Sequence, residues 1–340
     1  MGRPVDVGSA RDPVAAVLDA HAAGRRIALR TSGTTGLPRS VVRTPESWVR
    51  SFEHVAALTA MDPASQVWLP GPLTATMNLF AATLARHLGA RLVETPEHAT
   101  HAHLTPMLLA RALDERLPLG GLRTTVTGDR LGIGLRRRAE AAGVEVSHYY
   151  GSAELSFVAW GADDRSLRAF PGVEVEVRSD EVWVRSPYVC DGYDGPPGPL
   201  RRDPTGFATV GDRGSIVDGI LVVEGRGTDA VVTGGATVLV ADVEGVLRDR
   251  LHGTVVVVGV PHGSLGQVVA AALTEPADLA TAHAVSERHL TPAQRPRQWF
   301  HVPALPLTAA GKVDRSVLVD RITGSEAVRL VPRRPPVGTP

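Results

Sequence analysis

The chain has 340 residues, of which 43% are hydrophobic and 21% charged, a composition typical of soluble globular proteins. Its 36 Lys and Arg balance 36 Asp and Glu, so no net charge favours nucleic acid or an anionic membrane as partner. The single cysteine, Cys190, excludes an intrachain disulfide framework and a cysteine-based zinc site. With no signal-peptide core at the N-terminus and no apolar run of roughly 18 residues, we expect a cytoplasmic protein without membrane segments.

The first half of the chain alternates between helical and strand patterns. Apolar residues recur at helical spacing in several segments, and short apolar runs between turn residues predict strands. The predicted helices are 13–23, 46–61, 76–88, 108–115 and 134–142, and the predicted strands are 25–31, 66–69, 122–126 and 144–147. Such alternation is typical of α/β folds.

From Val173 the pattern changes to period two. Residues 173–187 alternate apolar and polar around a turn at Ser179–Asp180, and residues 215–226 do so around Asp218–Gly219, which predicts two β-hairpins. A compact α+β unit follows, with predicted helices 241–250 and 277–290 and strands 254–260 and 267–273.

The length exceeds one ordinary hydrophobic core and predicts two domains. We expect a large N-terminal α/β domain with a β-rich layer over residues 1–225. A small α+β domain that carries Lys312 should follow over 226–325, and a flexible tail over 326–340.

The segment TSGTTGLP, Thr31–Pro38, follows a predicted strand and combines four hydroxyl side chains with two glycines. Glycines allow the backbone to approach an anion closely, and hydroxyl and N–H groups can surround phosphate oxygens. The segment lacks the lysine of the P-loop, and no helix pattern starts directly after it. An ordinary Ser/Thr/Gly turn is the alternative interpretation.

Five motifs occur in the order found in one large family. TSGTTGLPR, HYYGSAEL (148–155), VGDRG (210–214), VEGRGTDAVVTGG (223–235) and LPLTAAGKVDR (305–315) resemble the motifs of the adenylate-forming superfamily. This family includes acyl-CoA and aryl-CoA synthetases, luciferases and adenylation domains. The resemblance covers roughly residues 25–318.

The resemblance implies a two-step ligase with a mobile C-terminal domain. A carboxylic acid, aryl or fatty, would react with ATP and Mg²⁺ to give an acyl-adenylate and pyrophosphate. The small domain would then turn about the residues after Gly225, and a thiol, most simply that of CoA, would displace AMP. A carrier protein or an amine is the alternative acceptor, and a homodimer is left open.

Lys312 is the single lysine of the sequence, so the other 35 of the 36 Lys and Arg are arginines. On the resemblance, it reaches the α-phosphate and the substrate carboxylate during adenylation. A compact ammonium on a flexible stem can neutralise charge developing on both groups, whereas the planar fork of Arg prefers bidentate geometry. A chance surface lysine after a glycine turn is the alternative.

Other roles also follow from the resemblance. Glu154 corresponds to the magnesium ligand, Tyr150 lies beside adenine with Gly151 leaving room for the base, and Asp212 accepts both ribose hydroxyls. The nucleotide would be bound by Thr31, Ser32, Gly33, Thr34, Thr35, Gly36, Arg39, Gly128, Asp129, Tyr150, Gly151, Ser152, Ala153, Asp212 and Arg226.

The acceptor and acyl sites are carried by fewer residues. Gly234 and Gly235 resemble the glycines that flank the tunnel for the pantetheine arm of CoA. Thr74 and Ala75 occupy the place where many members carry an aromatic–His pair near the substrate carboxylate, and His148 is a further candidate for the acyl pocket.

The sequence also departs from the family pattern. Only about 24 residues precede the first predicted strand of the resemblance, as in short o-succinylbenzoate–CoA ligases, which makes that activity one specific candidate. The departures within the motifs are Arg39, Ser40, Ala153, Val210 and Thr228. They motivate a rival interpretation, a catalytically degenerate nucleotide-binding protein.

Three histidines, His98, His101 and His103, fall within six residues. Such a cluster can bind a metal ion. Because no cysteine and only Glu97 among carboxylates lies near them, we expect a solvated loop instead.

Overall fold

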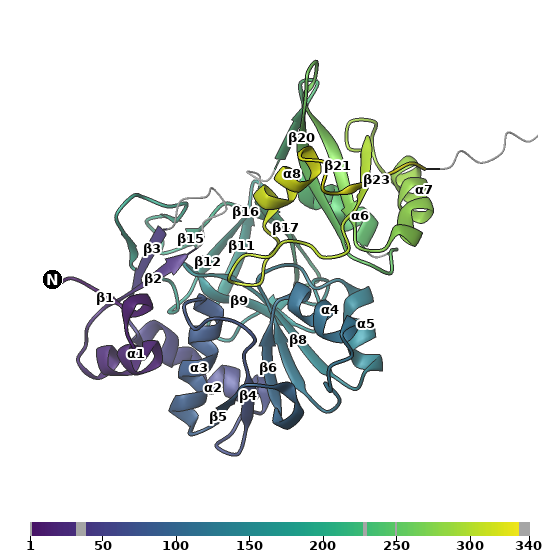
Figure 1. Ribbon diagram of the computed structural model, residues 1–340. Coiled ribbons are helices and arrows are strands. Elements are labelled where there is room, and N and C mark those ends of the chain that lie inside the picture. The colour runs from purple at the N-terminus through teal and green to yellow at the C-terminus, as the bar shows by residue number, and fades with distance from the viewer. Residues whose placement is uncertain (1, 32–38, 227–229, 249, 333–340) are drawn as a thin grey trace, which may run out of the picture. The chain divides into compact units, whose positions relative to one another are not determined.

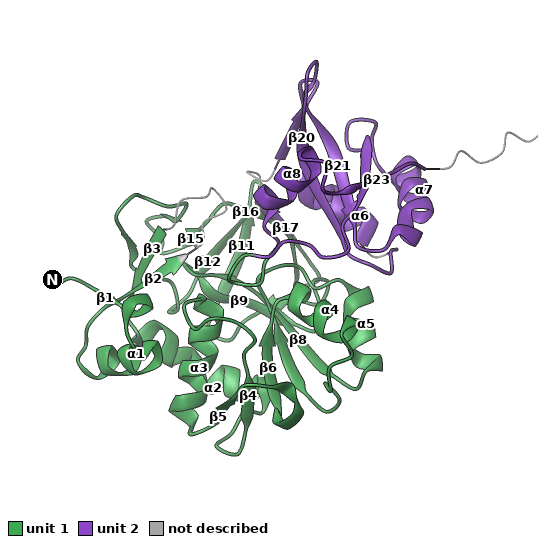
Figure 2. Cartoon of the chain, in the orientation of Figure 1, with its two compact units in different colours: residues 1–223, 308–312 green, residues 224–307, 313–340 purple. Residues whose placement is uncertain are grey.

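The computed structural model describes residues 2–31, 39–226, 230–248 and 250–332 (Figure 1). Figure 2 shows its two compact units. Unit 1 comprises Met1–Val223 with Thr308–Lys312, and unit 2 comprises Glu224–Leu307 with Val313–Pro340. No helix in the described part of the chain is long and apolar enough to cross a membrane.

The centre of unit 1 is a mixed sheet in the order β10-β9-β8-β7-β6-β4-β5. Strands β5, β4, β6, β7 and β8 pair in parallel, and β9 and β10 are added antiparallel. Their bounds are β4 Gln66–Trp68, β5 Arg91–Val93, β6 His101–Leu104, β7 Arg123–Val126, β8 Glu145–Ser152, β9 Ser156–Gly161 and β10 Arg168–Ala169. The predicted α/β class is confirmed.

The five predicted helices of unit 1 are present, and their ends differ from the predicted ends by at most two residues. They are α1 Pro13–Ala22, α2 Glu46–Thr59, α3 Thr76–Leu88, α4 Pro106–Asp114 and α5 Ile133–Ala141, with short 3₁₀ turns η1 Val7–Ser9 and η2 Pro96–His98. The side chain of Asp12 accepts the Ala15 N–H at 2.9 Å and caps α1, and Gly89 ends α3 in the left-handed conformation. Both α1 and α2 pack on α3, and α5 packs on β8.

Two further sheets complete unit 1. The first has the order β1-β2-β3-β13, with β1 Val5–Asp6, β2 Ile27–Thr31, β3 Arg39–Arg43 and β13 Gly192–Asp194. The second has the order β14-β15-β12-β16-β17 with β11 paired to β12. Its bounds are β11 Glu174–Arg178, β12 Glu181–Arg185, β14 Arg201–Arg202, β15 Ala208–Thr209, β16 Asp212–Val217 and β17 Ile220–Arg226.

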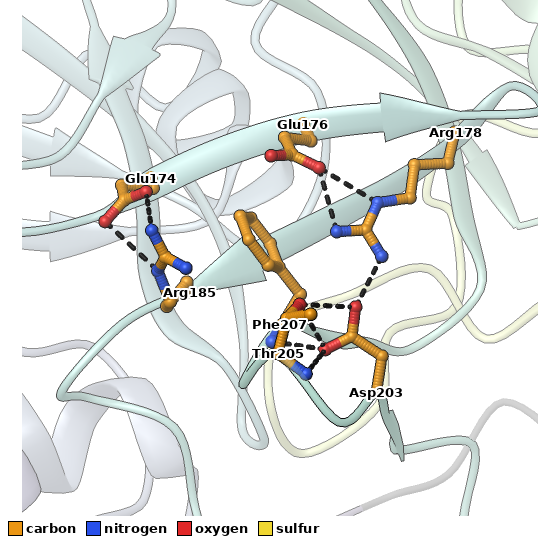
Figure 3. Close-up of polar contacts among 7 residues, drawn as sticks. All are labelled: Glu174, Glu176, Arg178, Arg185, Asp203, Thr205 and Phe207. Carbon is orange, nitrogen blue, oxygen red and sulfur yellow. Dashed lines mark hydrogen bonds and ion pairs between the residues drawn. The ribbon is translucent and has the colours of Figure 1, made fainter.

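Both predicted β-hairpins are confirmed. Ser179 and Asp180 have φ of 49° and 64°, and Asp218 and Gly219 have φ of 52° and 73°, as required by tight two-residue turns. Figure 3 shows the polar contacts of the first hairpin, where Arg178 bonds a carboxylate on its own strand and Asp203. The Arg178 guanidinium also lies 4.6 Å from the centre of the Phe207 ring, so the side chains tie the hairpin to the loop before β15.

Unit 2 is an α+β unit with its own core. Its sheet has the order β19-β18-β21-β22-β23 with β20 paired to β21. The bounds are β18 Ala230–Thr233, β19 Ala236–Leu239, β20 Val255–His262, β21 Gly266–Leu273, β22 Gln298–His301 and β23 Val328–Leu330, with helices α6 Val240–Arg248, α7 Leu279–His289 and α8 Arg315–Thr323 and the turn η3 Pro276–Asp278. Buried Val, Ala and Leu side chains of β20, β21 and α6 form the core.

Two sequence predictions are wrong. The flexible tail was expected from Glu326, but Val328–Leu330 form β23 and pair antiparallel with β22, because the edge of that sheet offers unpaired backbone groups. The histidine cluster was expected in a solvated loop, but His101 and His103 lie on β6 and are buried, because a parallel strand between two others is covered on both faces.

Candidate active site

Unit 1 holds a cavity of about 530 Å³ at the carboxyl ends of its parallel strands. Thr127 and Gly128 follow β7, and Tyr149, Gly151 and Ser152 come from β8. Ligands of open α/β sheets bind outside the carboxyl ends of the strands, so the topology places the cavity where a ligand site is expected. The motif HYYGSAEL lies at the end of β8, which runs to Ser152 rather than to the predicted Ser147.

Lys312 lines this cavity from a tight turn within the same unit. Thr308 N donates to Lys312 O at 2.7 Å and Gly311 N donates to Thr308 O at 2.9 Å, which closes the turn. The buried Thr105 hydroxyl at the start of α4 donates to Gly311 O at 2.6 Å. The turn is therefore attached to the end of β6 and to α4.

Gly128 allows the lysine side chain to lie along the cavity wall. Gly128 has φ +91°, and a Cβ built there would lie 3.0 Å from Lys312 Cε. Any other residue would be strained by the backbone conformation and would press on the lysine. The structure thus brings together two residues that the sequence placed in one site, Lys312 and Gly128.

Glu154 is buried, and both its side chain and its backbone accept hydrogen bonds. The Tyr193 hydroxyl donates to Glu154 Oε1 at 2.9 Å and accepts the Leu200 N–H at 3.1 Å. Cys190 N donates to Glu154 O at 2.7 Å. Burial and the neighbouring Glu154 carboxylate raise the pKa of Tyr193, so it is a neutral donor at neutral pH.

The carboxylate of Glu154 has the chemistry that Mg²⁺ requires, a hard oxygen donor. In the described ranges no group of three or more His, Cys, Asp or Glu is arranged to hold a metal ion. A magnesium ion at Glu154 would therefore take most of its ligands from phosphate and water, as Mg²⁺ commonly does.

Arg43 is a site residue that the sequence analysis missed. It is 0% exposed, and it donates to Ser156 Oγ at 2.7 Å and to Ala153 O at 2.6 Å. Burial lowers its pKa to about 10, so it remains a cation at neutral pH. Its guanidinium lies 5.4 Å from the centre of the Trp48 ring. The only sequence signal is a charged residue that directly follows two apolar residues, Val41 and Val42, at the end of β3.

Tyr150 and Asp212, predicted for adenine and ribose, are joined by one hydrogen bond. The Tyr150 hydroxyl donates to Asp212 Oδ2 at 2.6 Å, and Asp212 is buried at the start of β16. Asp129 follows Gly128 and accepts the Arg130 N–H at 2.7 Å. Residues from β8 and from the β-rich layer therefore meet at one place.

Some predicted glycines have a local structural reason. A Cβ at Gly151 would overlap the carbonyl oxygen of Ser156, where the β8–β9 register shifts at a bulge. Gly234 and Gly235 have φ of 55° and 85° and form the turn between β18 and β19. The proposed contacts of these glycines with nucleotide or CoA stay predictions.

Of the acyl-pocket candidates, Thr74 and Ala75 line the cavity. His148 is not among the described lining residues, and its Nδ1 lies 3.0 Å from Val126 O of the neighbouring strand β7. Burial lowers its pKa. Its neighbour Tyr149 faces the cavity instead.

The predicted nucleotide site includes residues inside and outside the described ranges. Ser32, Gly33, Thr34, Thr35, Gly36 and the departure Thr228 lie outside the described residues. Thr31 and Arg226 are the last residues of β2 and β17, and Arg39 is the first of β3. The β2–β3 pairing brings the two ends of the glycine–hydroxyl segment opposite each other, Thr31 against Arg39.

A parallel sheet with a cavity at the carboxyl ends of its strands is an arrangement typical of nucleotide-binding α/β proteins. The profile of a family described as AMP-binding enzyme matches residues 28–194. The sequence and the fold of the chain are similar to those of the adenylate-forming superfamily.

Its relatives include named ligases. The chain is 25% identical over 322 residues to an uncharacterized acyl–CoA ligase, YhfT of Bacillus subtilis, covering 84% of this chain and 66% of that protein. It is 28% identical over 307 residues to 2-succinylbenzoate–CoA ligase of Salmonella typhimurium, covering 85% and 67%. A similar solved structure is an E. coli MenE variant with bound OSB-AMS, with a TM-score of 0.75, 25% identity and coverage of 88% and 69%. The chain thus spans about two thirds of the length of these relatives.

Proposed function

We propose that the protein is an AMP-forming carboxylic acid–CoA ligase. It would convert an aryl or fatty acid and ATP to an acyl-adenylate and pyrophosphate, and then transfer the acyl group to the CoA thiol. The observation that carries this proposal is the position of Lys312, the single lysine, which is attached through Gly311 to Thr105 and lies along Gly128 in the cavity wall.

The chain's own residues would act mainly by position and charge. The Lys312 ammonium would lie between the acid's carboxylate and the α-phosphate, and would stabilise the negative charge shared by the two in the transition state. Asp212 would accept the ribose hydroxyls, with its orientation fixed by the Tyr150 hydroxyl. Bound Mg²⁺, with Glu154 as its protein ligand, would neutralise phosphate charge.

The second half-reaction would use a different face of the protein. We propose that the domain 226–325 turns about the residues after Gly225 and brings Gly234 and Gly235 to the thiol arm. ATP, Mg²⁺ and CoA are the proposed cofactors, and the cytoplasm is the proposed location. A carrier protein or an amine as acceptor, and a homodimer, remain alternatives to test.

Pyrophosphate release tests this function. Purified protein is incubated with MgATP and a panel of aryl and fatty acids, with and without CoA, beside Lys312→Ala and Lys312→Arg. We expect acid-dependent release that falls at least a hundredfold in Lys312→Ala, the loss typical of removing a transition-state donor, and is not restored by Arg. The acyl-CoA product identifies the acceptor. ATP binding without release on any acid would favour a catalytically degenerate binding protein.

A further inference from the structure

The cavity of unit 1 is lined by an unusual share of the chain's few aromatic residues. The sequence has only 6 Phe, 5 Trp and 4 Tyr, and four of these side chains line this one cavity. They are Trp48, Phe80, Tyr149 and Phe157, which come from α2, α3, β8 and β9. Aromatic residues far apart in the sequence therefore meet around one space.

The four rings form a continuous and rigid wall. Trp48 and Phe80 lie edge to face with centroids 5.4 Å apart, and Phe80 and Phe157 lie edge to face at 4.8 Å. Phe157 and Tyr149 are 4.5 Å apart. Each of the four is less than 9% exposed, so their orientations are fixed by packing before any ligand binds.

Further buried rings support this wall from behind. Phe170 stacks on Phe157 at 4.9 Å, and Trp160 stacks on Tyr149 at 5.7 Å with an angle of 9° between the planes. Neither Phe170 nor Trp160 is among the described lining residues. These two rings restrict how far Tyr149 and Phe157 can move away from the cavity.

Apart from Met77 and Pro72, the rest of the described lining consists mainly of small residues and carries little charge. Thr74, Ala75 and Ala153 contribute short side chains, and Gly128 and Gly151 contribute none. The charged residues in the described lining are Lys312 and Arg30, and Arg30 bonds Asp6 at 2.7 Å. The cavity thus offers a broad apolar space with few charged groups in its wall.

We propose that the acid activated at this site is an aromatic acid, with a planar ring carried on or near the carboxyl carbon, rather than a fatty acid. The proposal rests on the proposed function and narrows its substrate. Ring–ring contacts in edge-to-face or offset geometry stabilise a bound aromatic ring beyond the effect of the area that it buries. An alkyl chain makes no ring–ring contacts and loses conformational entropy when its flexible bonds are immobilised.

The test uses acids matched in size. Benzoate is compared with cyclohexanecarboxylate, and 2-naphthoate with decalin-2-carboxylate and decanoate. Calorimetry measures Kd for each acid on the whole protein, and pyrophosphate release measures kcat/KM. We expect the aromatic member of each set to be favoured at least tenfold in both measurements. Equal or better binding of the saturated ring or of decanoate would overturn the proposal, as would no binding of any acid.

Variants of the lining residues test whether the aromatic wall causes the preference for aromatic acids. Phe80→Leu keeps an apolar side chain but removes a ring from the cavity, and should reduce the aromatic preference at least fivefold. Phe300→Leu removes a buried ring that belongs to β22 of unit 2 and not to the wall, and serves as the matched control, which should keep the preference. If Phe80→Leu fails to fold, Trp48→Leu provides the same test. An unchanged preference in a folded lining variant would overturn the assignment.

The two proposals fail in different ways. Selective binding of aromatic acids without pyrophosphate release would contradict the ligase function and support the aromatic site. Release with fatty acids alone would support the ligase function and overturn the aromatic site.

Discussion

His103 should make the protein less stable as the pH falls from about 6.5 to about 4. The side chain is 4% exposed on β6, and its Nε2 has no hydrogen-bond partner among the described residues. Burial lowers its pKa from 6.5 to about 4, although a hydrogen bond to the Met77 backbone acts in the opposite direction. Below pH 6.5 the unfolded chain binds a proton that the folded chain does not, so acid favours unfolding.

The magnitude follows from this shift. One pKa unit corresponds to about 1.4 kcal/mol, so the full shift of His103 corresponds to a loss of about 3 kcal/mol in the free energy of unfolding. The contribution is fully present above pH 6.5 and is lost progressively toward pH 4. This loss is a large fraction of the total free energy of unfolding of an ordinary domain, which is about 5–15 kcal/mol.

Urea unfolding from pH 7.5 to 4.5 measures the effect on the wild type and on His103→Asn. Asparagine keeps a donor for the Met77 carbonyl but does not titrate. Burial also lowers the pKa of His101 and His148, and their contribution is the same in both proteins. We expect the difference in stability between the two proteins to change by 2–3 kcal/mol across this range, by the same linkage relation. Parallel pH profiles would refute the reasoning.

Three other predictions concern the site and its support. Thr105→Val removes the hydroxyl that bonds Gly311 O, so it should slow adenylation about fivefold to tenfold. The rate of acyl transfer to thiol from preformed acyl-adenylate should not change. An equal fall in both rates, or a similar fall in Thr105→Ser, would contradict this prediction. Gly151→Ala should lower the free energy of unfolding by about 3 kcal/mol, because its Cβ would overlap a β9 carbonyl oxygen. The control Gly263→Ala has open space around the new Cβ and should change the free energy of unfolding by less than about 0.5 kcal/mol. Equal denaturation midpoints for the two variants would contradict this prediction. Arg43→Met should lower the free energy of unfolding by about 3 kcal/mol or more, because it leaves several buried acceptors without donors. In thermal unfolding, Arg43→Lys should recover only part of this lost stability. A loss below about 1 kcal/mol in Arg43→Met would contradict this prediction.

The sequence predicted the regular elements well where one local rule decides them. Helix α3 begins at Thr76 and ends at Leu88 as predicted, because its apolar periodicity ends at Gly89, which has the left-handed conformation that terminates helices. The turns at Ser179–Asp180 and Asp218–Gly219 were predicted for the same reason, since polar residues and glycine tolerate positive φ.

The features that the sequence did not predict depend on tertiary contacts. Nothing local in the sequence shows that His101 and His103 lie on a strand covered on both faces, because that depends on β4 and β7 pairing on either side. Arg43 is buried because carbonyl groups from 110 residues later in the chain surround it. Motif matching placed Lys312 and Gly128 in one site but could not show that the lysine lies along the glycine.

The course of the chain around Lys312 limits how the protein can be divided. Thr308–Lys312 belongs to unit 1, while the residues on both sides of it belong to unit 2. A fragment ending at Val223 would therefore keep the sheet and the aromatic wall but lack the lysine turn. Exchange of the C-terminal region between homologues would likewise replace Lys312 and its docking turn together with the small unit, so a chimera must match Thr105 and Leu108 on α4 to the incoming Gly311.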